Sequence, residues 1–131
     1  MYTSTGKLRY SPKLTGERSE NWWLILDCDP DIGSYYRNLF KIGHYNCRKL
    51  QTPSWKEHIS VVRNEEPPNK LFWEKHIQKE VSFTYTPELR SDGIYVWLNV
   101  KCELLLDLRE ELGLPREPIY PLHLTIGNVV V

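Results

Sequence analysis

Residues 55–63, WKEHISVVR, predict a central β-strand, because β-branched side chains fill the second half of the segment. Side chains two positions apart in a strand share a face, so His58 and Ser60 lie on one side and Ile59 lies on the other. An apolar residue between two polar residues is typical of a strand with one face against the core. We therefore expect a buried strand whose second face carries an imidazole and a hydroxyl.

The same pattern returns near the end of the chain. Residues 122–131, LHLTIGNVVV, also form a β-branched run, and His123 and Thr125 share one face of the predicted strand. The two other histidines, His44 and His76, lack the pattern. If the two strands lie side by side, two imidazoles and two hydroxyls converge on one surface.

The segments around these two strands alternate between strand and helix signals. The expected strands are residues 22–28, 44–50, 81–86 and 94–100, with a hairpin turn at 91–93, and the expected helices are residues 29–43, 70–77 and 103–112. Residues 1–20 are rich in Ser, Thr, Gly and Lys without periodicity, which predicts a basic arm or lid. This order indicates one α+β domain over residues 21–131.

Composition limits the possible partners. Seventeen Lys and Arg balance seventeen Asp and Glu in the 131 residues, so no general field attracts a long nucleic acid such as genomic DNA. Three cysteines without C-x-x-C spacing argue against a disulfide framework and a zinc knuckle, and favour a reducing compartment. No apolar run approaches the roughly 20 residues of a membrane span. We expect a cytosolic protein with no membrane contact and a small or locally held substrate.

Two imidazoles beside two hydroxyls suit the cleavage of a phosphodiester. A neutral imidazole can remove a proton from the attacking oxygen while a protonated one gives a proton to the leaving oxygen, since the ordinary pKa of about 6.5 allows both states. The hydroxyls of Ser60 and Thr125 can donate hydrogen bonds to the non-bridging phosphate oxygens. The spacing of Glu57, His44 and His76 supports no metal site, so we expect neither a metal nor another cofactor.

With its two H-x-[ST] strands, the sequence resembles the 2H (two-histidine) phosphoesterase superfamily. The resemblance implies that His58 and His123 are the catalytic pair and that Ser60 and Thr125 bind phosphate. It also implies a bilobal α+β fold, in which antiparallel strands form a central cleft flanked by helices. The motifs cover two short segments, and the order of elements extends the likeness loosely over residues 22–131.

Within that superfamily the chain looks most like the small phage proteins that hydrolyse the cyclic oligonucleotide messengers of bacterial CBASS immunity. The shared features are DCDP at 27–30 before a Tyr-rich helix, Trp55 ahead of HISV at 58–61, residues 63–68, and LHLTIGN at 122–128. Ser60 departs from the expected Thr but keeps the hydroxyl. The likeness implies a phosphodiesterase acting on cyclic di- or trinucleotides in the host bacterial cytoplasm.

Four further residues are candidate substrate contacts, and each has an ordinary structural alternative. Tyr10 can stack a base if the basic arm folds over the site, and its alternative is a place in a solvated tail. Trp73 and Trp97 can also stack nucleobases, although core packing is the common role of such rings. Arg63 follows the first motif and can approach the phosphate, although an arginine at a strand end is usually solvated or paired with a nearby carboxylate such as Glu65.

Three other functions compete with hydrolysis of a cyclic messenger. One is an RNA-end enzyme that opens 2′,3′-cyclic phosphates or joins and cleaves 2′,5′ linkages. Another is a non-catalytic module that sequesters a cyclic nucleotide, although binding alone needs no acid and base pair. The third is a structural or interaction domain, which leaves the matched motifs unexplained.

Overall fold

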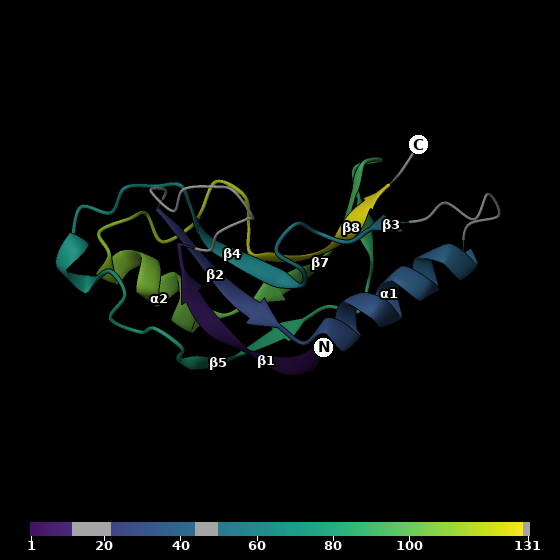
Figure 1. The fold of residues 1–131 in the computed structure, drawn as a ribbon, viewed down its shortest axis with the longest axis horizontal. Helices are drawn as coiled ribbons and strands as arrows, with labels where there is room; N and C mark the ends of the chain where they lie inside the picture. Colours follow the sequence, from purple (N-terminus) through teal and green to yellow (C-terminus); the bar gives the residue numbers. More distant parts are fainter. Residues whose placement is uncertain (12–21, 44–49, 130–131) are drawn as a thin grey trace.

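The computed structural model describes residues 1–11, 22–43 and 50–129 and shows a mixed α+β fold (Figure 1). The strands of these ranges form one antiparallel sheet in the order β3-β8-β4-β2-β1-β5-β7-β6, and an additional β7–β8 pairing closes six of them into a barrel. The elements are β1 Tyr2–Tyr10, β2 Trp23–Cys28, α1 Pro30–Gly43, β3 Leu50–Gln51, β4 His58–Arg63, a 3-10 turn Lys70–Phe72, β5 Glu80–Tyr85, β6 Arg90–Ser91, β7 Tyr95–Lys101, α2 Glu103–Glu111 and β8 His123–Val129.

Apolar side chains from alternate strand positions fill the barrel. Ile59 of β4 pairs with Leu124 of β8, which pairs in turn with Leu98 of β7, and all three are fully buried. Burying one such side chain contributes roughly 1.5 to 3 kcal/mol to folding. The inward positions of these strands therefore anchor the outward positions beside them, where the two motifs lie.

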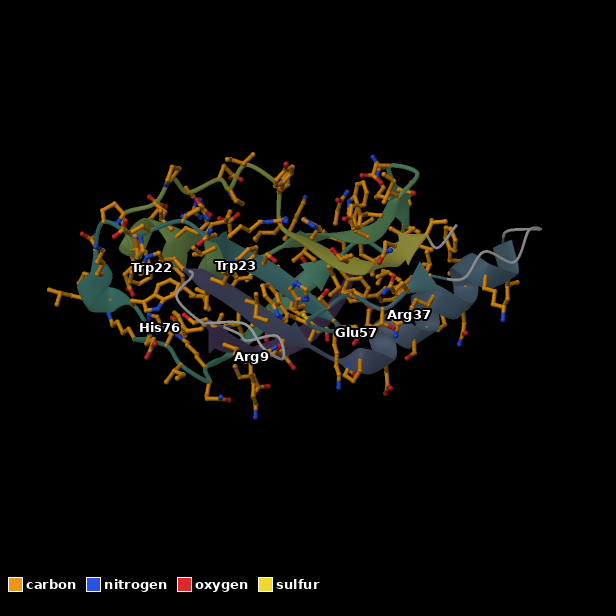
Figure 2. The ribbon with its side chains drawn as sticks, turned by 45° about the horizontal axis from the view of Figure 1, so that its top comes forward. Arg9, Trp22, Trp23, Arg37, Glu57 and His76 are labelled. Atoms are coloured by element: carbon orange, nitrogen blue, oxygen red, sulfur yellow. The ribbon has the colours of Figure 1, made fainter. Side chains whose placement is uncertain are left out.

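Helix α1 follows β2 directly and packs beside the motif strands. Asp29 caps it, since its Oδ1 accepts a hydrogen bond of 2.9 Å from the amide of Asp31. Arg37 then donates to Oε1 of the buried Glu57 at 2.7 Å and to the carbonyl of Ile126 at 3.1 Å (Figure 2). The helix is thus fixed to the residue that precedes His58 and to a residue of β8.

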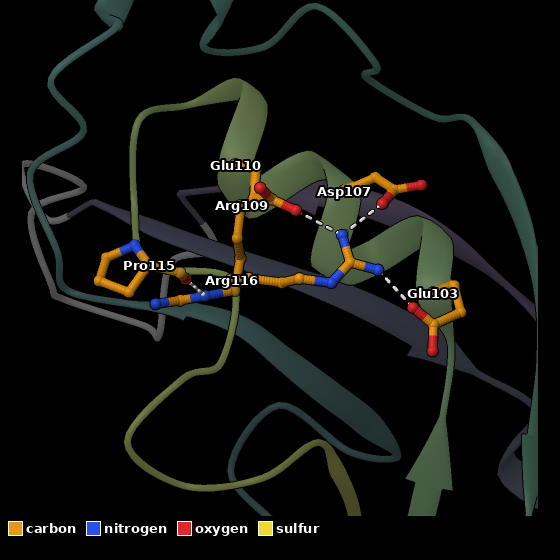
Figure 3. A network of polar contacts seen from close by, with 6 residues as sticks. All are labelled: Glu103, Asp107, Arg109, Glu110, Pro115 and Arg116. Carbon is orange, nitrogen blue, oxygen red and sulfur yellow. Dashed lines mark hydrogen bonds and ion pairs between the residues drawn. The ribbon is translucent and has the colours of Figure 1, made fainter.

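Helix α2 is joined to the barrel by Arg109, the largest fully buried side chain among the described residues. Its guanidinium donates to the carbonyl of Val61 at 2.8 Å, to the carbonyl of Pro115 at 2.8 Å, and to both carboxylate oxygens of Glu65 at 2.8 and 2.9 Å. Figure 3 shows Arg109 beside Arg116, whose exposed guanidinium contacts three acidic side chains of α2, Glu103, Asp107 and Glu110. The two arginines tie the loop before β8 to the helix.

Most of the expected elements are confirmed, with two corrections. The arm predicted over residues 1–20 is wrong for residues 2–10, which form β1 between β2 and β5; the other residues of that prediction from 12 onward lie outside the described part. The inward positions of β1 include Gly6, where a Cβ would lie 2.4 Å from the carbonyl oxygen of Asp27, so this strand carries little apolar periodicity. Small inward residues hide a central strand from pattern analysis.

The second correction concerns the helix predicted over residues 70–77. Only a short 3-10 turn forms there, and Glu74 has a φ of 66°, in the left-handed region that ends a helix. Of the edge strand predicted over residues 44–50, only Leu50 is described, and it belongs to β3. The α+β class and the antiparallel pairing are confirmed, and among the described residues no helix is both long and apolar enough to span a bilayer.

The position of Arg109 predicts a large loss of stability on its removal. Arg109→Ala leaves the Glu65 carboxylate and the Val61 carbonyl without their partner, which should lower the free energy of unfolding by about 3 kcal/mol in urea denaturation. The matched control is Arg116→Ala, which breaks exposed ion pairs on the same helix and should change the unfolding midpoint little. Equal losses in the two variants would contradict the role assigned to Arg109.

Candidate active site

The four motif residues lie together on the outer face of the barrel. Ile59 and Leu124 are direct partners in the antiparallel β4–β8 pair, so the register sets His58 beside Thr125 and Ser60 beside His123. All four side chains are half-buried, whereas the residues between them are fully buried in the core. The strands expected to lie side by side do so, and their polar faces coincide.

Both imidazoles are oriented by a hydrogen bond to a backbone carbonyl two residues earlier in the chain. Nδ1 of His58 lies 2.9 Å from the carbonyl oxygen of Lys56, and Nδ1 of His123 lies 2.7 Å from the carbonyl oxygen of Pro121. A carbonyl can only accept, so each Nδ1 carries the hydrogen and the lone pair of each neutral ring is on Nε2. Lys56 has a φ of 59°, a strained conformation of the kind found beside functional sites.

The two histidines have different electrostatic surroundings. Burial lowers the pKa of His58, while the carboxylate of Asp27 opposes that shift and the charges of His123 and Arg9 add to it. Burial also lowers the pKa of His123, and the nearby guanidinium of Arg63 lowers it further. The Asp27 carboxylate thus favours protonation of His58, whereas the Arg63 guanidinium disfavours protonation of His123.

A β-bulge brings Arg63 to the motif face. Leu24 of β2 pairs with Val62, whereas the next residue, Ile25, pairs with Ser60, so Val61 is the extra residue in β4. Strict alternation would turn Arg63 away from Ser60, but the bulge reverses the alternation. The Arg63 guanidinium lies 5.0 Å from the centroid of the Tyr120 ring, close enough for a cation–π contact.

The predicted pairing of Arg63 with Glu65 takes a limited form. The Arg63 backbone amide donates to Glu65 Oε1 at 3.1 Å, while the Glu65 carboxylate binds Arg109 through two hydrogen bonds. Those Arg109 bonds are the main cause of the lowered pKa of Glu65. Glu65 is therefore committed to Arg109, and the Arg63 guanidinium remains on the side of His123.

Aromatic rings border the site on both sides. Trp97 of β7 is the register partner of Thr125, and its ring centroid lies 6.3 Å from that of His123. On the other side, the Trp55 centroid lies 5.6 Å from that of His58 and 5.0 Å from that of Trp23. The candidate contact Trp97 is thus placed at the site, while sequence reasoning assigned no substrate contact to Trp55 or Trp23.

The structure does not bring Tyr10 and Trp73 to the histidines. Their ring centroids lie 4.9 Å apart, Trp22 packs against Trp73 at 5.1 Å, and Tyr10 and Trp73 both contact the hydrophobic core. Figure 2 shows Trp22 near His76, away from Glu57. This packing favours the structural alternative for Trp73. Tyr10 lies in β1 and packs against the core, so it is neither in a solvated tail nor over the histidines.

Two charged residues on the motif face were not among the predicted site residues. Asp27 is the β2 partner of His58, and Arg9 binds the Asp27 carboxylate through Nε at 2.8 Å and Nη2 at 3.0 Å. Their proximity follows from the pairing of β1 with β2 and of β2 with β4, which no local pattern reveals. The alternation of charge and apolar residues in LRY at 8–10 and LILDC at 24–28 was the available signal.

A groove of about 550 Å³ between α1 and the ends of β1 and β5 is lined mainly by Tyr2, Tyr35, Tyr36 and Tyr85, and by none of the four motif residues. Within residues 1–11, 22–43 and 50–129, no three His, Cys, Asp or Glu side chains are grouped as metal ligands.

The outer face of β4 and β8 thus presents two oriented imidazoles, two hydroxyls and one guanidinium, bordered by indole rings. This set can exchange protons at two points and donate hydrogen bonds to an oxyanion between them. Compared with known proteins, the chain matches no family model, no curated protein and no solved structure.

Proposed function

We propose that this protein is a metal-independent phosphodiesterase. The observation that carries the proposal is the convergence of His58, His123, Ser60 and Thr125 on one face, with each imidazole oriented by a hydrogen bond from Nδ1 to a backbone carbonyl. A surface selected only for folding has no need of two such oriented rings beside two hydroxyls. Proton transfer at two positions around one phosphorus atom does need them.

The proposed reaction joins an attacking oxygen to phosphorus as the bond to the leaving oxygen breaks. One imidazole takes the proton of the attacking water or ribose hydroxyl at Nε2, and the other supplies a proton from Nε2 to the leaving oxygen. Ser60 and Thr125 donate hydrogen bonds to the non-bridging oxygens, and the Arg63 guanidinium offsets the charge that develops there. With water as the attacking group, the products are a phosphomonoester and an alcohol; with a ribose hydroxyl, they are a cyclic phosphate and an alcohol.

The substrate class that we propose is a cyclic oligonucleotide messenger, hydrolysed by a phage enzyme in the host cytoplasm to counter bacterial CBASS immunity. Indoles on both sides of the motif residues support it, because a phosphate inside a cyclic oligonucleotide has a nucleoside on each side and each base offers a face for stacking. The bilobal cleft implied by the resemblance is part of this proposal, with β4 and β8 as its floor.

Incubation in excess EDTA with a defined panel tests the reaction and the substrate together. The panel contains cyclic di- and trinucleotides, an RNA ending in a 2′,3′-cyclic phosphate, and a 2′,5′-linked dinucleotide. The products are separated by chromatography. We expect cleavage of a cyclic oligonucleotide without added metal, because the chemistry depends on imidazoles. Cleavage of the RNA end alone would move the substrate assignment to RNA-end processing.

A variant without the two histidines separates binding from catalysis. The double variant His58→Ala, His123→Ala should still bind the panel but release no product. Activity that disappears in EDTA and returns with zinc or manganese would contradict the metal-independent mechanism, and tight binding by wild type without turnover would indicate sequestration of the messenger.

The four motif residues should contribute unequally. Replacing His58 or His123 with Ala removes a proton transfer, which commonly costs about 10² to 10⁴ in rate, and the double variant should be scarcely slower because the pair acts as a unit. Replacing Ser60 or Thr125 with Ala removes one hydrogen bond to the phosphate, with an expected cost of about 10² to 10³. Single-turnover rates measure these losses, and normal rates in a folded His58→Ala would exclude two-histidine catalysis.

The dependence of kcat/KM on pH should be bell-shaped, because one imidazole must be neutral while the other is protonated. Burial lowers the pKa of both histidines, so the maximum should lie on the acidic side of the value near 6.5 that exposed imidazoles would give. Activity should fall above the maximum as the acid loses its proton and below it as the base gains one. A flat profile between pH 5 and 8 would be incompatible with this pair.

A further inference from the structure

Opposite charges face the two histidines on the outer surface of the barrel. Asp27 is the β2 partner of His58, and the same residue pairs with Lys7 of β1. Arg9, two positions from Lys7 on the same outward face, holds both Asp27 oxygens. Figure 2 shows Arg9 on the barrel face near the strands that carry this pair. The Asp27 carboxylate, held by Arg9, is therefore positioned on the neighbouring strand beside the His58 imidazole.

The surroundings of His123 contain a cation and no carboxylate among the residues that pair with it or shift its pKa. Its β7 partner is Asn99, whose Oδ1 accepts a hydrogen bond of 3.2 Å from Nε1 of Trp97. From β4, it faces Ser60 in the register and the guanidinium of Arg63 through space. The charged groups that act on His58 are Asp27, Arg9 and His123 itself.

We propose that Asp27, held by Arg9, is a positioning residue that makes His58 the general acid and leaves His123 as the general base. The inference rests on the phosphodiesterase function proposed above and gives each imidazole its role. Nε2 of His123 takes the proton of the attacking oxygen as its bond to phosphorus forms. The bond to the leaving oxygen breaks, and that oxygen receives the proton from Nε2 of His58. The net charge of the pair is unchanged, and solvent returns the proton from His123 to His58.

Asp27 acts on His58 through its charge. Its two oxygens are occupied by hydrogen bonds from Arg9, and the His58 Nδ1 hydrogen is directed to the Lys56 carbonyl. The carboxylate stabilises the imidazolium form of His58, while Arg63 destabilises that form of His123, and these are the directions in which the two groups move the pKa values.

The first test needs no activity and follows each imidazole by NMR titration. In Asp27→Asn, the pKa of His58 should fall because the carboxylate charge is lost, while that of His123 should be nearly unchanged. Arg9→Gln should move His58 in the opposite direction, which keeps the test decisive if Asp27→Asn folds poorly. The matched control is Asp31→Asn, the same change in the first turn of α1, which should move neither histidine. A shift confined to His123, or no shift in either variant, would overturn the role of Asp27.

The second test identifies the acid by the leaving group. Bis(p-nitrophenyl) phosphate releases a phenolate that needs little protonation, so a missing general acid matters less than a missing base. We expect His58→Ala to lose about 10² to 10⁴ in rate on the cyclic oligonucleotide, yet to stay within about tenfold of wild type on the activated ester. His123→Ala should be impaired on both substrates. The reverse pattern would assign the acid to His123.

The two tests separate the possible failures. If wild type cleaves no phosphodiester, the proposed function fails, while the titration still shows whether Asp27 controls His58. If wild type is active and the leaving-group pattern is absent, the function stands and the assignment of acid and base fails. In the active enzyme, Asp27→Asn should also move the alkaline limb of the kcat/KM profile to lower pH and leave the acidic limb in place.

Discussion

The hydrogen bond from buried Arg109 to the carbonyl of Val61 is the constraint on which the surface chemistry depends. Val61 is the extra residue of the β4 bulge, and a bulge leaves backbone groups without their sheet partners. Arg109 satisfies that carbonyl from inside the fold and binds Glu65 just beyond the strand. With the bulge fixed, Val61 and Val62 are both buried and Arg63 emerges on the motif face. A contact on the core side of the strand thus determines which charge lies beside His123.

How much could be predicted from the sequence varies with the range of the interaction. The alternation of His58, Ile59 and Ser60 is local, and it correctly indicated which side chains share a face. The start of α1 is local as well, and the helix expected over residues 29–43 agrees with it. Strand β1 was missed because Gly6 approaches the β2 backbone and leaves little apolar signal. The contacts of Asp27 depend on the pairing of three strands. The side of the sheet on which Arg63 lies depends on a bulge that is held by Arg109 of α2. Neither can be derived from periodicity.

The two histidines share their orientation and differ in their charge surroundings. The orientation comes from short hydrogen bonds to carbonyls two residues earlier, so it belongs to each strand alone. The charge difference comes from neighbouring strands, with Asp27 on one side and Arg63 on the other. The hydrogen bonds to the carbonyls give the two rings the same orientation, and the neighbouring charges make one ring easier to protonate than the other. An acid and a base made from the same side chain require such a division.

Closure of the barrel also determines how any ligand can be recognised at this face. β4 is paired on both sides, by β2 and β8, and β8 is paired by β4, β7 and β3. Neither strand is a free edge of the sheet, so a ligand does not join either of them as an additional strand. Ligand recognition must therefore come from the outward-facing side chains of β4 and β8. Such a surface can exchange one ligand preference for another by substituting single outward residues, while the inward residues keep the fold intact.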